Sequence, residues 1–274
     1  MDQLLRAGAD VRLADLDTRA TPGFDGDKDA GVAALAAGAD ELSALQEKLF
    51  AASRAGDERR ILLVLQAMDT AGKGGILRHV VGAVDPQGVA LAAFKKPTPE
   101  ELAEHFLARI ERRLPGPGMI GVFDRSHYED VLIARVRELA PADEIERRYG
   151  EIRDFERRLV DDGTRVIKVM LHISPDEQKE RLQERLDRED KHWKYNPGDV
   201  DERMLWPKYM EAYERAIAET DADHAPWFVV PADRKWFARL AVQHLLLREL
   251  RALDPQWPAA DFDVEVEKVR LDHS

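Results

Sequence analysis

The segment from residue 61 to residue 75 reads ILLVLQAMDTAGKGG, an apolar run followed by a glycine-rich turn. The apolar run, Ile61–Ala67, has the composition of a strand that is buried on both faces. Ile76, Leu77 and Val80 follow the turn at helical spacing. A strand, a glycine-rich turn and a helix in this order are typical of a phosphate-binding loop, because the backbone N–H groups and the dipole at the helix start favour an anion. We therefore predict a phosphate-binding site at this turn.

The turn supplies both a positive charge and close approach of the backbone. Lys73 places a mobile cation at the start of the helix, where it can neutralise phosphate oxygens. The other residues predicted to contact phosphate here are Ala71, Gly72, Gly74 and Gly75 of the turn and Arg78 of the helix. The alternative is a glycine-rich turn that merely carries a surface lysine.

The turn departs from the pattern G-x-x-x-x-G-K-[S/T] at two positions. Ala67 stands at the first glycine position, and Gly74 stands where a Ser or Thr hydroxyl normally ligates Mg²⁺. The turn carries Asp69 at its centre instead. A carboxylate that faces phosphates is repelled unless a cation lies between them. We therefore expect Asp69 to help hold the Mg²⁺ ion, or Mn²⁺ in its place, that the missing hydroxyl would have held.

A second carboxylate ends another apolar run. Met119–Phe123 has the pattern of a buried strand and is followed directly by Asp124 and Arg125. An apolar strand that ends in Asp is the form of a Walker B element. Asp124 is therefore a candidate metal ligand, acceptor for metal-bound water or base toward the attacking oxygen, and its alternative role is that of a helix N-cap. Arg125 can hold phosphate oxygens with two parallel hydrogen bonds.

Two shorter groups are also candidate ligand contacts. The residues that open the next predicted helix lie at the same face and are candidates for nucleotide binding, although acidic residues are common in any first helical turn. They are His127, Tyr128, Glu129 and Asp130. Lys95 and Lys96 follow the second predicted strand, and we predict an anion track there, with a simple charged turn as the alternative.

A row of arginines lies on one face of the helix that is predicted after the fourth strand. Ser174 followed by Pro175 is a strong helix start, and a loop with two lysines follows the helix. The candidate phosphate ligands are Arg181, Arg185, Arg188, Lys191 and Lys194. We predict that residues 175–205 form a lid that closes over phosphates, excludes water and neutralises charge. The alternative is a solvated helix laced by Glu–Arg pairs.

Short apolar runs alternate with helical patterns from residue 61 onward. The predicted strands are Ile61–Ala67, Val89–Phe94, Met119–Phe123, Val166–His172 and Trp227–Pro231. The predicted helices are Ala39–Ala55, Gly75–Val81, Pro99–Leu114, His127–Arg137, Asp143–Asp161, Pro175–Arg188, Asp201–Thr220 and Lys235–Leu253. This alternation indicates an α/β fold, a parallel sheet between two helical layers, with ligands at the carboxyl ends of the strands. We expect an N-terminal arm over residues 1–38 and one domain over residues 39–274.

Composition narrows the class of protein further. The chain has 274 residues and a formal net charge of −12 at pH 7, and an acidic chain is a poor candidate for nucleic-acid binding, which relies on a basic footprint. No apolar run approaches the roughly 18 residues that a membrane span needs. No secretory signal is visible at the N-terminus, so we expect a cytoplasmic protein without a membrane partner. The absence of cysteine excludes disulfides, zinc–thiolate sites and thiol catalysis.

Together these segments resemble the second family of polyphosphate kinases, from about Leu42 to Leu250. The resemblance is carried, in this order, by Leu65–Gly75, Val84–Val89, Phe94-Lys95 with Pro97-Thr98, Phe123–Leu132, and Gln178–Asp187 with Trp193-Lys194. The set in this order is highly specific, whereas the glycine-rich turn alone would not be.

The resemblance implies a three-layer P-loop kinase fold of the thymidylate-kinase type with a helical lid. It implies Mg²⁺-dependent phosphoryl transfer between inorganic polyphosphate and nucleoside diphosphates or monophosphates in either direction, so that ADP becomes ATP or AMP becomes ADP. It also implies that Asp69, Lys73, Asp124 and Arg125 are the central residues, and that the lid cations hold phosphates. Family members are usually homo-oligomers. The form His-Tyr-Glu-Asp-Val-Leu at residues 127–132 resembles the subgroup reported to accept both AMP and ADP, and guanine nucleotides are further candidates.

The residues by themselves leave two other functions open. An ATP-dependent nucleotide or small-molecule kinase on the same fold would act with ATP and an acceptor, and not with polyphosphate. A non-catalytic nucleotide-binding module would bind nucleotide without turnover, although the retention of both carboxylates and of the lysine counts against it.

Overall fold

The computed structural model describes all residues from 1 to 274 and contains a single parallel sheet. Its strands are Arg60–Ala67 (β1), Val89–Ala93 (β2), Ile120–Asp124 (β3), Thr164–His172 (β4) and Trp227–Pro231 (β5). They lie in the order β2-β3-β1-β4-β5, and every neighbouring pair is parallel. The five predicted strands and the parallel sheet are thereby confirmed.

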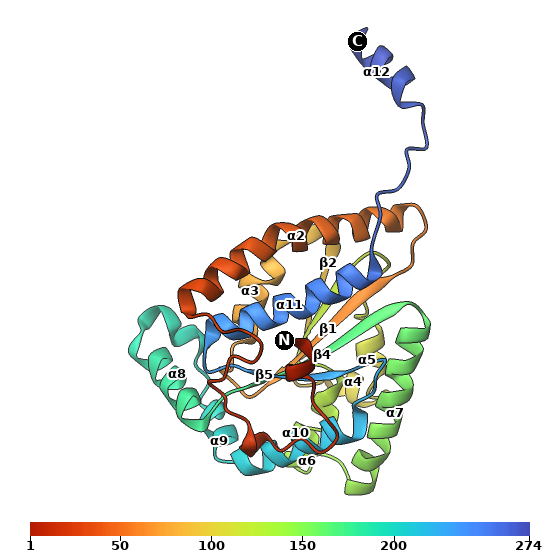
Figure 1. Cartoon of the computed structure of the whole chain (residues 1–274). Helices are drawn as coiled ribbons and strands as arrows, with labels where there is room; N and C mark the ends of the chain where they lie inside the picture. The colour runs from red at the N-terminus through yellow and green to blue at the C-terminus, as the bar shows by residue number, and fades with distance from the viewer.

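Helices cover both faces of this sheet. They are Asp2–Leu5 (α1), Lys28–Arg54 (α2), Lys73–His79 (α3), Pro99–Leu102 (α4), Ala108–Glu111 (α5), Ile133–Val136 (α6), Ala142–Asp161 (α7), Pro175–Asp187 (α8), Gly198–Arg203 (α9), Trp206–Thr220 (α10), Lys235–Leu253 (α11) and Val264–Asp272 (α12). Helices α2, α3 and α11 pack on one face, and α7 and α10 pack on the other (Figure 1). The expected three-layer α/β fold is therefore confirmed.

The central strand β1 shows why the sheet is buried on both sides. Ile61, Leu63 and Leu65 belong to the core beneath α2, α3 and α11, whereas Leu62 and Val64 belong to the core beneath α7 and α10. Successive side chains of a strand point to opposite faces, so a strand between two helical layers must be apolar throughout. This requirement explains the continuous apolar run in the sequence.

The strand register brings the two predicted carboxylates to one edge of the sheet. Asp124, the last residue of β3, lies opposite Leu65 of β1 and Ala93 of β2. The glycine-rich turn leaves β1 just beyond that point. The carboxyl ends of the three strands β1, β2 and β3 thus open onto one common space, as the general rule for such sheets requires.

Helix α2 is longer than predicted, because it begins at Lys28 rather than at residue 39. The carboxylate of Asp27 caps the helix by accepting a hydrogen bond from the N–H of Ala30 at 2.9 Å. Gly31 allows close packing on α11, since a Cβ atom there would lie 2.2 Å from the ring of Trp236. The Ala- and Gly-rich first turns have little hydrophobic periodicity, so the pattern did not reveal them. The helix passes through the predicted boundary between residues 38 and 39.

The preceding arm is mostly irregular, as expected, but it is packed against the domain. The N–H of Ala7 donates to the carbonyl of Trp227 at 2.9 Å, and Leu5 and Leu13 are buried. The N–H of Asp233 donates to the carbonyl of Thr18 at 3.1 Å. The arm therefore covers the outer edge of the sheet next to β5.

Three predicted helices are broken. The pattern over Asp201–Thr220 is divided between α9 and α10 by a turn at residues 204–205. The pattern over Pro99–Leu114 forms only α4 and α5, because the chain turns between them to bury Leu107 and Ile110. The pattern over His127–Arg137 forms a short 3₁₀ turn followed by α6. Over residues 99–114 and 127–137, tertiary packing overrides helix propensity.

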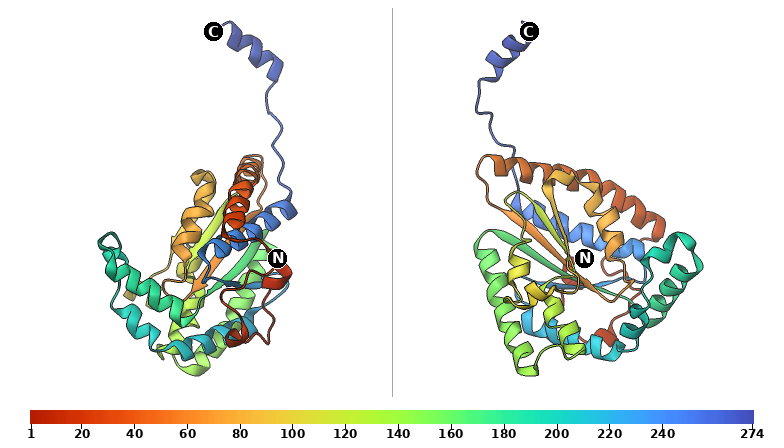
Figure 2. Two further views of the ribbon diagram at one scale, coloured as in Figure 1. Left: turned by 60° about the vertical axis from the view of Figure 1, so that its left-hand side comes forward. Right: turned by 180° about the vertical axis from the view of Figure 1, so that it is seen from behind.

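The last segment of the chain extends away from the body and ends in α12, which the sequence did not predict (Figure 2). No side chain of α12 is buried. No helix of the chain has both the length and the apolar character needed to cross a bilayer.

Candidate active site

The glycine-rich turn connects β1 with α3. The side chain of Lys73, the first residue of α3, points back over the turn. Gly72 directly precedes the helix with a φ of 123°, a backbone conformation that favours glycine. The Lys73 ammonium Nζ donates a hydrogen bond to the carbonyl of Ala67 at 3.3 Å. The ammonium group therefore lies above the turn, where it can meet phosphate oxygens.

Asp69 and Arg125 connect the turn with the end of β3. Arg125 Nη2 donates to Asp69 Oδ1 at 3.0 Å, and the N–H of Arg125 donates to the carbonyl of Leu65 at 3.0 Å. Arg125 has a φ of 64°, a left-handed conformation that costs energy for a residue with a side chain. Asp69, Asp124 and Lys73 therefore share one edge of the sheet, which is the arrangement that the sequence predicted.

Several charged groups at this edge influence one another. Burial lowers the pKa of Arg125, but the nearby carboxylates of Glu129 and Asp69 outweigh burial and raise that pKa above its ordinary value. Burial and the negative charge of Asp69 together raise the pKa of Asp199 in α9 to about 6. Burial also raises the pKa of Glu129 against the opposing charges of Arg125 and Lys73. Acidic and basic groups are thus held together in a space from which much water is excluded.

The carboxylates at this edge suit a hard divalent cation with few protein ligands. Nowhere in the chain do three carboxylate or histidine side chains converge as a metal-binding group. Mg²⁺ commonly uses one or two protein carboxylates and completes its octahedron with water and substrate phosphate. Asp69 and Asp124, at the ends of adjacent strands, fit this limited role, and they would hold the ion if it were bound.

A cation-lined hollow of about 200 Å³ opens beside the turn, between α8 and the start of α11. We call it the cationic hollow. Its positively charged lining residues are Arg181, Arg185, Lys191, Lys194, Lys235 and Arg239. Glu184 is the only carboxylate in its lining. Such a concentration of one charge in an acidic chain favours an anionic ligand.

Lys235 and Arg239 of α11 were not predicted as site residues. The Arg239 guanidinium lies 3.6 Å from the position that a Cβ atom on Gly75 would take. Burial and the positive charge of the neighbouring Arg78 lower the pKa of Arg239. The available signal was their four-residue spacing at the start of the helix that follows β5, because β5 ends at the same edge of the sheet.

Arg181 does not lie free in the lid, and its prediction as a phosphate ligand is corrected. Its side chain is 5% exposed. The N–H groups donate to Glu177 Oε1 at 2.7 Å, to the carbonyls of Thr70 and Ala71 at 3.0 and 2.9 Å, and to the carbonyls of Ala232 and Asp233 at 2.6 and 3.1 Å. A guanidinium has five N–H donors, so this set uses them all. Arg181 holds the turn in place from α8.

The other lid residues remain accessible. Arg185 donates to the carbonyl of Lys194 at 2.9 Å and to Asp199 at 3.2 Å, which ties α8 to the loop and to α9. Lys191 and Lys194 line the cationic hollow. Arg188 is exposed and paired with Glu184 and Asp190, so it lies outside the lining of the hollow.

A second, larger hollow of about 610 Å³ is lined by Arg125 and by no residue of the turn. We call it the apolar-walled hollow. Its apolar lining includes Phe94, Leu102, Ile133 and Leu139, and its cationic lining includes Lys95, Lys96, Arg109, Arg125, Arg137 and Arg148. A smaller hollow of about 180 Å³, lined by Asp69, Arg125, Glu129, Asp199 and Tyr213, lies between Asp69 and the lid. Arg125 lines both of these hollows.

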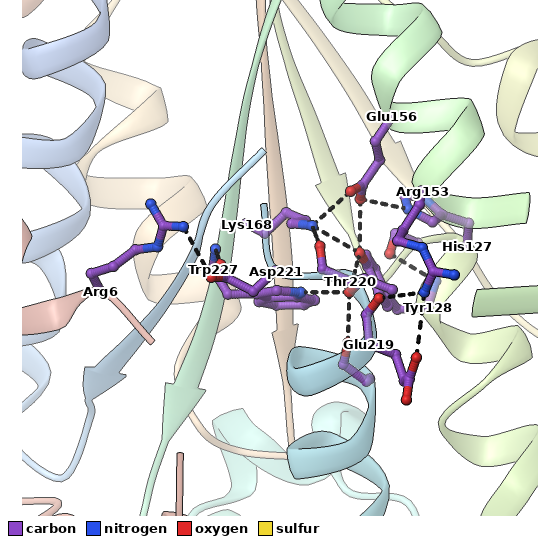
Figure 3. Close-up of polar contacts among 12 residues, drawn as sticks. Arg6, His127, Tyr128, Arg153, Glu156, Lys168, Glu219, Thr220, Asp221 and Trp227 are labelled. Atoms are coloured by element: carbon purple, nitrogen blue, oxygen red, sulfur yellow. Dashed lines mark hydrogen bonds and ion pairs between the residues drawn. The ribbon is translucent and has the colours of Figure 1, made fainter. Parts of the chain in front are cut away.

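His127 and Tyr128 are not available to a nucleotide, which corrects their predicted role. Both side chains are 0% exposed. The Tyr128 hydroxyl lies 2.8 Å from Glu156 Oε1 and 2.9 Å from Thr220 Oγ1, and the His127 ring lies 3.3 Å from Glu156 (Figure 3). They face the core under α7 and α10 because the segment forms a 3₁₀ turn and not the predicted helix.

Glu129 and Asp130 remain near the hollows. Glu129 lines both the apolar-walled and the smaller hollow. Asp130 lines the apolar-walled hollow, but its carboxylate is held by Arg109 at 3.3 Å and lies 3.9 Å from Arg148. Asp130 therefore holds the arginines that line this hollow and is not itself free for a ligand.

A central parallel strand that runs into a glycine-rich phosphate turn, with a Walker B carboxylate on the adjacent strand and a basic lid, defines a P-loop kinase. The chain belongs to the polyphosphate kinase 2 family, whose model, described as "Polyphosphate kinase 2", matches residues 25–258. It is accordingly a phosphotransferase.

Relatives and solved structures agree with this assignment. An "AMP/ADP-polyphosphate phosphotransferase" from Meiothermus ruber is 47% identical over 238 residues, which cover 87% of this chain and 88% of the relative. An "ADP-polyphosphate phosphotransferase" from Rhodopseudomonas palustris is 42% identical, over 80% of this chain and 78% of the relative. The crystal structure of polyphosphate kinase 2 from Arthrobacter aurescens TC1 has 57% identity and a TM-score of 0.97, and covers 99% of this chain and 96% of that one.

Proposed function

We propose that this enzyme transfers phosphoryl groups reversibly between inorganic polyphosphate and ADP or AMP. Its relatives from M. ruber and R. palustris are named for this kind of reaction. The single observation that carries the proposal is that two hollows of different chemistry meet the paired site residues. The cationic hollow is lined by the turn, and the apolar-walled hollow is lined by Arg125, which is hydrogen-bonded to Asp69 of the turn. A donor that is only phosphate and an acceptor that has a base would need two such spaces.

Polyphosphate would occupy the cationic hollow. A linear polyphosphate carries about one negative charge for each internal phosphate and no apolar group, so cations on several sides stabilise it best. The hollow supplies Lys191 and Lys194 from the lid and Lys235 and Arg239 from α11. Arg78, exposed on α3, would extend the same track.

The nucleotide would occupy the apolar-walled hollow. Phe94, Leu102 and Ile133 offer surface to a base, and Lys95 and Lys96 offer charge to phosphate. Arg125, at the boundary, can contact the reacting phosphates. The hollow has no evident group that selects adenine over guanine, so guanine nucleotides are included in the proposal as acceptors.

Asp69 and Asp124 would hold Mg²⁺, or Mn²⁺ in its place, between them and the phosphates. When bound, the ion supplies charge neutralisation and orientation of phosphate oxygens. Lys73 and Arg125 take up negative charge on the transferred group, and lid closure excludes water. Phosphoryl transfer needs mainly positioning and charge neutralisation from the protein, and these side chains can supply both.

The test is a matched set of assays on the purified protein with Mg²⁺. Polyphosphate with ADP or AMP should yield ATP or ADP, and ATP with polyphosphate primer should run in reverse. Transfer from ATP to an acceptor with no use of polyphosphate would establish the ATP-dependent kinase instead. Nucleotide binding without any turnover would establish the binding module.

We also propose that the enzyme is a homo-oligomer. The support is the C-terminal arm, residues 256–274, which leaves the body (Figure 2). It carries exposed apolar side chains. Trp257 is 54% exposed and Phe262 is 58% exposed. A second copy of the chain would cover these exposed apolar side chains.

A further inference from the structure

A fully buried ion pair lies in the core directly behind the Walker B segment. Lys168 of β4 is 0% exposed and Glu156 of α7 is 1% exposed, and Lys168 Nζ donates to Glu156 Oε2 at 2.6 Å. The other two donors of the ammonium reach the Tyr128 hydroxyl at 3.1 Å and the carbonyl of Thr220 at 2.7 Å. Figure 3 shows these groups converging from α7, β4, α10 and the turn after β3.

Burial of this ion pair in the core is unfavourable in free energy compared with apolar side chains. The desolvation of two buried charges often exceeds their attraction, and apolar residues of similar volume can replace such a pair without loss of stability. The pair does not contact either hollow or the phosphate turn. Its contacts are instead with Tyr128 and His127, two residues that follow Arg125 closely in the chain.

A short chain of contacts runs from the pair to Arg125. The Tyr128 N–H donates to Ser126 Oγ at 3.1 Å. The side-chain oxygen of Gln66 in β1 accepts from the Ser126 hydroxyl at 2.9 Å and from the Ser126 N–H at 3.1 Å. Arg125 precedes this anchored turn and has the left-handed φ of 64°. A backbone conformation of this kind persists only where the surroundings hold it. Asp124 is fixed on one side by the pairing of β3, and the anchored turn fixes the other side.

We propose that Lys168 and Glu156 are positioning residues that hold Arg125 in its strained conformation beside Asp69. They act through Tyr128 and His127 and touch no substrate. The inference rests on the proposed role of Arg125 in binding the transferred phosphoryl group. It extends the active site into the core by one layer of buried polar contacts.

A double-mutant cycle tests the inference. Glu156→Gln should lower kcat about 10- to 100-fold, because a misplacement of about 1 Å can cost about 100-fold in rate. It should change the KM of each substrate less than about 3-fold. In the Arg125→Ala background the same change should lower kcat less than about 2-fold, since a missing side chain cannot be misplaced. Equal losses in both backgrounds would show that the pair does not act through Arg125.

Two further variants separate positioning from stability. Ile152→Ala, one turn away in α7 and fully buried, should lower the Tm with little effect on kcat. Lys168→Met with Glu156→Leu fills the same space with apolar groups and should keep the Tm but not the kcat. Wild-type kcat in that double variant would overturn the proposal.

The readouts also distinguish this inference from the proposed function. If Glu156→Gln does not fold, Tyr128→Phe removes only the hydroxyl and should show the same dependence on Arg125. If wild-type protein shows no turnover with polyphosphate, the proposed function fails. The same cycle is then measured as kcat with ATP as the phosphoryl donor. A loss confined to the background that contains Arg125 is expected, and an additive loss contradicts the inference.

Discussion

At the scale of single residues, the site depends on charged side chains that are neutralised only in part within the chain. Asp69 lies between Arg125 and the space where phosphates would bind, and Arg239 has no carboxylate partner in the cationic hollow. Such groups contribute to ligand binding more than to folding, because a bound ion or phosphate completes their charge balance. Two predictions follow from this distinction.

Asp69→Asn should lower kcat by at least about 100-fold, a loss typical of removing one preorganised electrostatic contact. The amide keeps the size of the side chain but weakens its hold on Mg²⁺. Circular dichroism and Tm should be unchanged. Asp154→Asn, at an exposed position of α7, is the matched control and should keep full activity. Wild-type kcat in Asp69→Asn would refute the proposed metal role.

Arg239→Ala should raise the KM for polyphosphate about 10-fold, corresponding to roughly 1.4 kcal/mol, and leave the KM for ADP nearly unchanged. The effect should shrink at high ionic strength, since salt screens contacts between charges. Steady-state kinetics at two salt concentrations measure both quantities. Arg157→Ala, exposed on α7, should have no effect. A rise confined to the ADP KM would place the nucleotide, and not polyphosphate, in the cationic hollow.

At the scale of elements, the lid is held by a few polar contacts rather than by a broad apolar interface. Arg181 fixes the base of α8 to the turn, whereas α9 is tied to α8 through Arg185 and Asp199. Asp199 lies in this contact with a raised pKa, near the negative charge of Asp69. The outer lid should therefore respond to pH and to bound cations more than its base does.

The pKa of Asp199 gives a prediction for stability. Its ordinary value of 3.8 rises to about 6 in the folded chain, so between these values the folded state binds more protons than the unfolded state. Stability attributable to Asp199 should then fall as pH rises from about 4 to about 6 and stay level above. Asp199→Asn should gain about 1–2 kcal/mol over wild type across this interval.

Urea unfolding of both proteins at pH 4.5 and 7.5, without divalent ions, measures this difference. Asp201→Asn, exposed in the same helix, should follow wild type at both values. A constant difference between Asp199→Asn and wild type at the two pH values would contradict the assignment.

At the scale of the whole molecule, the domain is complete without its last residues. Leu253 and Pro255 are the last buried positions, and no side chain from residue 256 onward is buried. The arm nevertheless carries Trp257, Phe262 and four apolar side chains of α12 in exposed positions. An extended segment with such side chains suits contact with another copy of the chain better than contact with water.

A chain that ends at Gln256 should therefore keep its Tm as a folded unit but lose subunit association. Size-exclusion chromatography with light scattering should report a smaller mass for the truncated chain than for the full chain. Trp257→Gln with Phe262→Gln in the full chain should have the same effect without shortening it. Equal masses for all three proteins would rule out the arm as the contact between subunits.

The sequence by itself was sufficient for the sheet, the phosphate turn and the Walker B strand. A buried parallel strand must be apolar throughout, and a turn that approaches phosphate needs glycine and lysine at adjacent positions. These requirements act over a few residues, so Ile61–Gly75 and Met119–Arg125 could be interpreted locally. The order of such segments along the chain also made the family resemblance specific.

The tertiary structure alone decided which polar side chains are free to meet a ligand. Arg181 and Arg185 occupy the same face of one helix. Arg181 is buried and donates to Glu177 and to four backbone carbonyls of distant segments, whereas Arg185 is only partly buried and donates within the lid, to Lys194 and Asp199. Lys235 and Arg239 join the site from the last helix of the domain, and His127 and Tyr128 turn into the core. Hydrogen-bond partners and burial depend on contacts between residues far apart in sequence, and no local pattern contains that information.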